Sequence, residues 1–408
     1  MARTRDPAVS PDDITTVAVR LFDYCRQNGW SGHDPYDALN SGVFNALPML
    51  DFKLFRLAAT QLLKRSPIDV RPLLAVPKTQ NPKALGLFLT ACAHLARSRL
   101  VADIDAVEND LVGSLIALRA RGERHWCWGY SFPWQTRTIL VPRGAPNLVC
   151  TTFVASGLLD AYDRRHDRRH LELATSAAEY ILDELYWTDD DGYSGFRYPL
   201  PASRARVHNA NFLAAALLCR VYHHTGEARF LAPALKAARY SVSRQHVDGS
   251  WDYGEFSSQR WKDNFHTGFN LCALRSVETY APTAEFADSI RRGFAFYRQH
   301  FFRPDGAPKY FHDRAYPLDI HSVAQSIITM TTLRDLHEKS MPMAHATLRW
   351  AMAHLWDDRG FFYYRKLKFA TIKISYMRWS QAWMLAALGA LVATGSRRAP
   401  ASTTAAAA

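Results

Sequence analysis

The sequence lacks any run of about 18 uncharged apolar residues, the length that a helix needs to cross a bilayer. It therefore predicts a soluble protein. Near its start, Asp6, Asp12 and Asp13 stand where a signal peptide would need its apolar stretch, so we expect no export by that route. The hydrophobic fraction of 48% and the aromatic fraction of 12% are typical of a folded globule.

Cysteine is scarce, with six residues in 408 and no CxxC pair. Cys25, Cys92, Cys219 and Cys272 lie in apolar helical patterns, which favours buried, reduced thiols over disulfides or zinc ligands. We therefore expect a reducing, cytoplasmic location. The metal-binding patterns HxH and HExxH are also missing, so we expect neither a metal nor another cofactor.

The formal charge of +12 favours an acidic partner, which could be a nucleic acid, an anionic lipid or an acidic glycan. No helix-turn-helix, RNP or zinc-finger pattern is present, so we expect no nucleic acid partner. The final stretch "TGSRRAPASTTAAAA", from residue 394 to 408, has no apolar periodicity and predicts a disordered tail. Residues 1–393 are predicted to form one domain.

Helices rich in small and apolar residues recur along the chain. Their expected starts are Asn147, Asn209, Asn264, Asp319 and Met377. Between 55 and 62 residues separate neighbouring starts, which is room for two helices and their loops. More amphipathic helices such as "LELATSAAEYILDELYW" lie between them, and four earlier stretches beginning at residues 12, 52, 83 and 105 extend the scheme. The pattern predicts an all-α fold, an (α/α)6 or (α/α)7 toroid with a buried inner ring and a solvated outer ring.

Glycine and aromatic residues mark the connections that follow the outer helices, as in "DGSWDYGE" at 248–255 and "DRGFFYYR" at 358–365. An Asp-Gly pair turns the chain, and the rings then alternate as they do in a short strand. In a ring of hairpins these connections gather at one mouth. They have two possible uses there, which are closing the end of the toroid and stacking on a carbohydrate.

The first polar residue of each inner helix aligns between repeats. The aligned residues are Asn147, Asn209, Asn264 and Asp319. Capping of the helix is their main interpretation. Two positions further on, the aligned residues are Val149, Asn211, His266, His321 and, in the last repeat, Trp379. Because first-turn side chains can lean into the funnel near the positive ends of the helices, we predict that His266 and His321 meet at a site.

Acidic and phenolic residues accompany the two histidines. The candidate catalytic residues are His266, His321, Asp263, Asp319 and Tyr316. Hydrolysis of a glycosidic bond needs two carboxyl groups, whereas elimination or epimerisation beside a carboxylate can use His and Tyr while Arg neutralises the acid. All three reactions remain open. The candidate substrate-binding residues are Trp128, Trp134, Asn209, Asn211, Trp251, Tyr253, Glu255, Arg260, Arg314, Arg378 and Trp379.

Four segments carry a resemblance to a known group of proteins. "WGYSFPWQTR", "VPRGAPNLVCTTFVASGLLDAY", "DNFHTGFNL" and "YPLDIHSVAQSI" resemble bacterial proteins associated with exopolysaccharide biosynthesis, over about residues 124 to 385. The helical period more distantly resembles the α/α toroids of N-acylglucosamine 2-epimerases, glucuronyl C5-epimerases, polysaccharide lyases and six-hairpin glycosidases. The resemblance implies a glycan context without naming a reaction.

Residues and resemblance together predict a carbohydrate-active protein of bacterial surface polysaccharide biosynthesis. Its expected partners are an acidic polysaccharide or oligosaccharide and other polysaccharide-assembly proteins. A non-catalytic glycan-binding or scaffold protein is the main alternative. A second alternative is a terpene-cyclase-like toroid, because "QHVDGSWDYG" is similar to a QW repeat, although the DxDD acid motif is missing.

Overall fold

Six helices form a closed inner ring in the computed structural model, which describes residues 10–136 and 139–395. They are α4 (Pro82–Leu95), α6 (Leu148–Arg165), α8 (His208–Thr225), α10 (Asn264–Tyr280), α12 (Ile320–Thr332) and α14 (Trp383–Gly395). Each packs on the next, and α14 returns to α4. Glycine allows the backbones of α4 and α6 to approach each other closely. A Cβ on Gly157 of α6 would lie 2.3 Å from the backbone oxygen of Gly86 on α4, which is too close for any side chain. The ring therefore contains six hairpins.

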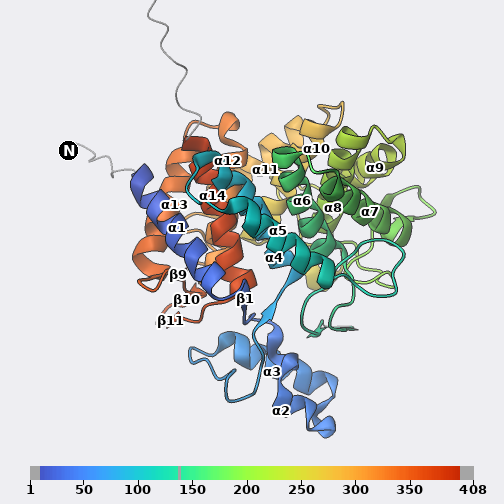
Figure 1. Cartoon of the computed structure of the whole chain (residues 1–408). Helices are drawn as coiled ribbons and strands as arrows, with labels where there is room; N and C mark the ends of the chain where they lie inside the picture. Colours follow the sequence, from blue (N-terminus) through green and yellow to red (C-terminus); the bar gives the residue numbers. More distant parts are fainter. Residues whose placement is uncertain (1–9, 137–138, 396–408) are drawn as a thin grey trace, which may run out of the picture.

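Six further helices cover the ring from outside (Figure 1). They are α1 (Pro11–Gln27), α5 (Ile104–Ala117), α7 (Arg168–Tyr180), α9 (Leu231–Val242), α11 (Ala287–His300) and α13 (Ser340–Leu355). In α11 the buried residues Ile290, Phe294 and Tyr297 recur at helical spacing and face inward, as expected of an outer helix. Since α1 packs on α14, the first and last helices of the described chain close the sixth hairpin.

Short antiparallel strand pairs form the connections at one end of the ring. The pairs are β1 (Ser31–Gly32) with β2 (Thr79–Gln80), β3 (Trp134–Gln135) with β4 (Leu140–Val141), β5 (Tyr186–Thr188) with β6 (Ser194–Phe196), and β8 (Trp356–Asp357) with β9 (Phe361–Phe362). A three-stranded sheet has the order β11 (Thr371–Ile372), β10 (Arg365–Lys366), β7 (Leu318–Asp319). Glycine makes the turns possible, with φ of +81° at Gly192 and +93° at Gly360. The predicted strand-like connections are therefore present.

The inner helices begin at slightly different residues from those predicted. The residues that precede their first turns are Asn81, Asn147, Val207, Asp263, Asp319 and Tyr376, the last of which precedes a π-helix (Met377–Ala382) that continues into α14. Asn209 was predicted as a capping residue, but the cap of that helix is Val207, two residues earlier. Asn264 was also predicted as a cap, but the cap of that helix is Asp263, one residue earlier. Val207 caps without a side-chain bond and leaves no sequence signal, whereas Asp263 rather than Asn264 accepts the first backbone N–H. As a result, His266 and His321 are not equivalent positions.

A small lobe interrupts the ring between α1 and α4. It contains α2 (Gly42–Asn45) and α3 (Lys53–Arg65), and Figure 1 shows it projecting from the end where β1 lies. The pairing of β1 with β2 joins the two segments that connect the lobe to the ring. The stretch beginning at residue 52 was predicted to extend the hairpin repeat, and this prediction is wrong because α3 packs in the lobe.

Within residues 10–136 and 139–395, no helix is both long enough and apolar enough to span a membrane. All six cysteines are free thiols, and five of them are buried. Helix α14 continues to Gly395, so the predicted tail at 394–408 begins inside a helix, and its remainder lies outside the described residues.

Candidate active site

A cavity of about 600 Å³ opens at the N-terminal ends of the inner helices. The floor of the cavity consists of one residue from each inner helix, the one two positions after the capping residue. These residues are Lys83, Val149, Asn209, Phe265, His321 and Arg378. Six helix N-termini converge there, and their aligned peptide dipoles favour a negatively charged ligand.

Asp263 and His266 form a hydrogen-bonded pair at the edge of this floor. The Asp263 carboxylate is buried and lies 2.8 Å from Nδ1 of His266, while it also accepts the backbone N–H of His266 at 2.9 Å. Because a carboxylate only accepts hydrogen bonds, Nδ1 carries the proton. Nε2 is then the free ring nitrogen, and it has no hydrogen-bond partner among the described residues. The side chain is 20% exposed and lines the cavity, so Nε2 can receive a proton from a ligand.

His321 lies in the floor between aromatic rings. Its ring is stacked at 4.5 Å from both Phe265 and Trp383, measured between ring centroids. Both of its nitrogens are buried without a hydrogen-bond partner in the described part of the chain. Burial, assisted by the nearby cations Lys83 and Arg378, lowers the pKa of His321 well below its ordinary value. His321 is therefore a neutral imidazole with unused hydrogen-bonding capacity.

Lys83 is a buried basic residue that forms no ion pair with the described residues. Its ammonium lies 4.3 Å from the ring centroid of Phe153 and 5.2 Å from that of Trp383, and it makes no hydrogen bond or ion pair with the described residues. Burial, and then the charge of Arg378, lower the pKa of Lys83 well below its ordinary value. A ligand carboxylate in the cavity would supply the missing counter-charge.

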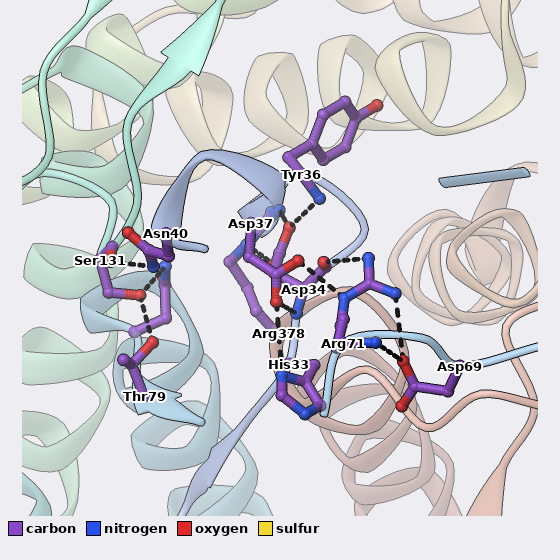
Figure 2. Close-up of polar contacts among 11 residues, drawn as sticks. His33, Asp34, Tyr36, Asp37, Asn40, Asp69, Arg71, Thr79, Ser131 and Arg378 are labelled. Carbon is purple, nitrogen blue, oxygen red and sulfur yellow. Dashed lines mark hydrogen bonds and ion pairs between the residues drawn. The ribbon is translucent and has the colours of Figure 1, made fainter. Parts of the chain in front are cut away.

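Arg378 has a different environment, because the lobe supplies its counter-ion. Asp34 binds it in a bidentate ion pair, with Nε to Oδ2 at 2.6 Å and Nη2 to Oδ1 at 2.8 Å. Arg71 in turn donates to the carboxylate of Asp37 and to the backbone oxygen of Asp34, and Figure 2 shows this group with the ring of Tyr36 pointing away from it. The Tyr36 ring lines the cavity. The lobe thus contributes both an anchor for Arg378 and a part of the cavity wall.

Aromatic side chains make up most of the wall. Tyr253 and Trp261 are stacked, with 4.3 Å between their centroids and an interplanar angle of 9°. Burial raises the pKa of Tyr253 well above its ordinary value and raises that of Tyr198 to about 12. These phenols therefore keep their protons at neutral pH and can donate hydrogen bonds to a polar ligand, while their faces suit the apolar face of a sugar ring.

The ionisable groups around the cavity are strongly unbalanced. The described lining contains five basic side chains, which are Lys83, Arg260, Lys262, Arg314 and Arg378. Its one carboxylate is Asp313, which lies 3.6 Å from Arg314. Lys262 is neutralised by Asp252 at 2.9 Å, but Lys83 and Arg260 have no carboxylate partner among the described residues. No group of three or more His, Cys, Asp or Glu side chains in residues 10–136 and 139–395 is placed to hold a metal ion.

Several of the predicted site residues lie together at this cavity. The residues that line it are His266, His321, Trp134, Asn209, Tyr253, Arg260, Arg314, Arg378 and Trp379, with Asp263 directly behind His266. The two histidines contact the same ring, since Phe265 lies 4.3 Å from His266 and 4.5 Å from His321 between centroids. The predicted convergence of His266 and His321 on one funnel therefore matches the geometry, while their catalytic roles stay a prediction.

Other predicted residues do not line this cavity. Asp319 is fully buried and engaged by Arg365 and by Nε1 of Trp379, so its carboxylate has a structural role. Tyr316 instead lies under the guanidinium of Arg303. The indoles of Trp128 and Trp251 are buried and donate to the backbone oxygens of Leu115 and Ser241. These two rings pack in the core between inner and outer helices, since Trp128 contacts α5 and Trp251 contacts α9 and Phe212 of α8.

Two predicted polar ligands are also used within the protein. Asn211 accepts the backbone N–H of Phe196 at 2.8 Å and donates to Ser241 at 2.9 Å, so it fastens a connection to α8. Glu255 contacts Tyr240, Arg244 and Arg206 outside the cavity.

Important residues were also missed. Lys83 follows "QNP", in which Asn81 caps α4 and Pro82 occupies its first turn, so a helix start was visible in the sequence. Counting two residues from that cap would have placed Lys83 in the floor. The contribution of Tyr36 and Asp34 had no such signal, because Asp34 meets Arg378 across 344 residues of sequence.

Comparison with known proteins establishes the fold. No family model matches the chain, and no curated protein sequence matches it. A family 76 glycoside hydrolase (mannosidase) from Bacteroides thetaiotaomicron has a TM-score of 0.62 at 12% identity, covering 94% of this chain and 98% of that chain. An unsaturated glucuronyl hydrolase from Streptococcus agalactiae has a TM-score of 0.61 at 11% identity, covering 95% and 93%. A sugar epimerase from a ruminal bacterium has a TM-score of 0.58 at 10% identity, covering 79% and 90%.

The chain therefore has an α/α-toroid fold, similar to the folds of solved hydrolases, a lyase and an epimerase, which confirms the predicted fold class. At these identities the likeness concerns the fold, and the chemistry has to be argued from the cavity itself.

Proposed function

We propose that this protein is a carbohydrate-active enzyme that removes the proton next to the carboxylate of a uronate residue in an acidic glycan. The observation that carries the proposal is the His266–Asp263 pair at a cavity lined by five basic side chains, of which Lys83 and Arg260 have no carboxylate partner among the described residues. Support at the level of the fold comes from similar structures that are hydrolases, a lyase and an epimerase.

The charge pattern favours elimination or epimerisation over hydrolysis. Hydrolysis uses two carboxyl groups that face each other across the scissile bond. Here Asp313 is half-exposed beside Arg314, and the carboxylate of Asp263 is committed to His266. Abstraction of a proton next to a carboxylate instead builds negative charge on that carboxylate, and cations stabilise this charge. Lys83 and Arg378 in the floor are suited to that role.

The removal of the proton and the elimination can be assigned to groups of this chain. Nε2 of His266 takes the C5 proton while Asp263 stabilises the imidazolium that forms. The electron pair left on C5 is delocalised into the carboxylate beside Lys83. In elimination, this pair forms the C4–C5 double bond as the C4–O bond breaks, and a neutral phenol such as Tyr253 protonates the leaving oxygen. In epimerisation, a proton returns to C5 from the opposite face.

The biological context is part of the proposal. The resemblance of four sequence segments to exopolysaccharide-associated proteins favours a substrate from bacterial surface polysaccharide synthesis, handled in the cytoplasm alongside assembly proteins. Incubation with acidic and neutral oligosaccharides, followed by mass spectrometry and NMR, tests the proposal. Elimination yields an unsaturated uronate, and epimerisation alters NMR couplings at constant mass. Gain of water would indicate hydrolysis, and binding without any product would indicate a non-catalytic scaffold.

A further inference from the structure

The lobe between α1 and α4 has an unusually apolar surface. Fourteen large hydrophobic side chains are exposed in the described chain, and eight of them fall between residues 43 and 73. Met49 is 81% exposed, Ile68 70% and Leu73 82%. The other six are scattered over the toroid from Leu118 to Phe369. Scattered apolar side chains are ordinary on a protein surface, but a concentration in one small lobe indicates an interaction site.

Helix α3 carries an apolar stripe on its outer side. Leu54 and Leu62 are 72% and 69% exposed, and Ala58 between them is also exposed, so the stripe has helical spacing of four residues. The opposite side of α3 buries Ala59 and Leu63 within the lobe. A surface helix normally presents polar residues to water, whereas the outer side of α3 presents a row of apolar residues.

Basic residues border this stripe. Lys53 and Arg65, at the two ends of α3, are exposed and make no ion pair with the described residues. The acids of the lobe are already engaged, since Asp51 pairs with Arg56 at 2.7 Å and Asp69 with Arg71 at 3.5 Å. The outer surface of the lobe therefore combines exposed apolar side chains with unneutralised positive charge.

We propose that the lobe docks on the surface of an anionic lipid bilayer. Leu54, Leu62 and Met49 would enter the boundary between headgroups and acyl chains, and Lys53 and Arg65 would meet lipid phosphates. A hollow of about 410 Å³ lined by Leu62, Leu63, Val70 and Arg65 offers both contacts to one phospholipid. A lipid surface matches this combination because it offers acyl chains to the apolar side chains and phosphates to the basic side chains over the whole length of the lobe.

Docking would bring the cavity close to the membrane. Lys64 of α3 hydrogen-bonds to the Tyr36 hydroxyl and lies 5.9 Å from the ring centroid of Trp379, and both rings line the cavity. Arg56 of α3 also bonds to Gln135 of β3 at 2.9 Å. The lobe is thus fastened to the mouth of the toroid, and a docked lobe would hold that mouth at the bilayer surface. This inference does not depend on the chemistry proposed for the cavity.

Vesicle co-sedimentation of the full chain tests the inference. Vesicles of phosphatidylglycerol mixed with phosphatidylcholine should bind the protein, and vesicles of phosphatidylcholine alone should bind it much less. The variant Leu54→Ser/Leu62→Ser should bind at least about tenfold more weakly. Each of Lys53→Glu and Arg65→Glu should weaken binding about fivefold or more, with the loss greatest at low salt.

The matched control is Val247→Ser/Phe369→Ser, which removes two apolar residues outside the lobe that are 98% and 91% exposed, and it should bind as the wild type does. All variants should keep the wild-type melting temperature, because the changed side chains are exposed. Two results would overturn the inference. One is equal sedimentation with both kinds of vesicle. The other is a dimer in solution that Leu54→Ser/Leu62→Ser dissociates, which would make the lobe an interface between copies of this chain.

Discussion

Asp263 holds His266 at two points, through the backbone N–H at 2.9 Å and the ring Nδ1 at 2.8 Å. The first bond caps helix α10, and the second fixes the ring and its tautomer. One carboxylate therefore serves both the fold and the proposed chemistry.

These two roles can be separated by Asp263→Asn. An asparagine oxygen can still cap the helix, but the side chain no longer stabilises a protonated His266. We expect kcat to fall by about 10²–10⁴ while the melting temperature stays close to wild type. The matched control is Asp313→Asn, which removes the one carboxylate of the described cavity lining and should leave kcat within a few fold. Loss of activity only in the control would favour a carboxylate-based hydrolysis instead.

Replacing Lys83 should change stability and ligand affinity in opposite directions. A buried ammonium without an acidic partner destabilises the fold, so Lys83→Met should raise the free energy of unfolding by about 1 kcal/mol or more. Affinity for an acidic oligosaccharide should fall at least tenfold, and affinity for a neutral analogue should change little. Differential scanning calorimetry and titration calorimetry measure the two effects. An unstable Lys83→Met protein would contradict this account of the floor.

His321→Phe tests whether the unsatisfied imidazole serves a ligand. The ring is already stacked between Phe265 and Trp383, and neither nitrogen has a hydrogen-bond partner in the described chain. Phenylalanine should therefore preserve or raise the melting temperature, while substrate affinity or turnover falls about tenfold or more if a ligand uses the nitrogens. Unchanged kinetics with a stable fold would make His321 a packing residue only.

The pair of Asp34 and Arg378 should behave as a buried ion pair. Asp34→Ala leaves a buried guanidinium without its counter-ion, and we expect a loss of about 3–5 kcal/mol in the free energy of unfolding by urea. The double variant Asp34→Leu/Arg378→Met removes both charges and should lose clearly less. If both variants lost the same free energy of unfolding, the unpaired charge of Arg378 would not be the cause of the loss in Asp34→Ala.

His208 provides a test of pH dependence. It is buried at the start of α8 against Ser241, and burial lowers its pKa to about 4 from an ordinary 6.5. As the pH falls, the unfolded chain takes up this proton first, so the free energy of unfolding should decrease between about pH 6.5 and about pH 4 and change no further below that range from this residue. His208→Gln should flatten this decrease in a series of urea melts. A wild-type slope in the variant would contradict the assignment.

The sequence predicted the ring well because its inner and outer helices differ in composition at a regular period. It failed for α3, whose amphipathic pattern resembles that of an outer helix although it packs in the lobe. The capping positions were misplaced at α8 because Val207 caps through its backbone alone, and at α10 because "DN" offers two adjacent capping residues. Sequence patterns find polar caps and overlook backbone caps.

The site was only partly predictable, for a similar reason. First-turn geometry brought His266 and His321 to the cavity, and the same rule applied to α4 would have found Lys83. Trp128 and Trp251 were predicted to bind substrate but are buried in the core, although they lie in glycine-aromatic connections as Tyr253 does. Trp251 and Tyr253 are two residues apart, so a regular strand would place both rings on the same side. The chain is not a strand at these residues, and the sequence does not show that departure.

The central claim is that His266 removes a proton from the carbon beside a uronate carboxylate. A uronate oligosaccharide carrying deuterium at C5 tests it directly, because both elimination and epimerisation release this label to water. NMR should show loss of the label with the wild-type protein and retention of the label with His266→Gln at an unchanged melting temperature. Cleavage of the glycan with the C5 label retained would contradict the claim.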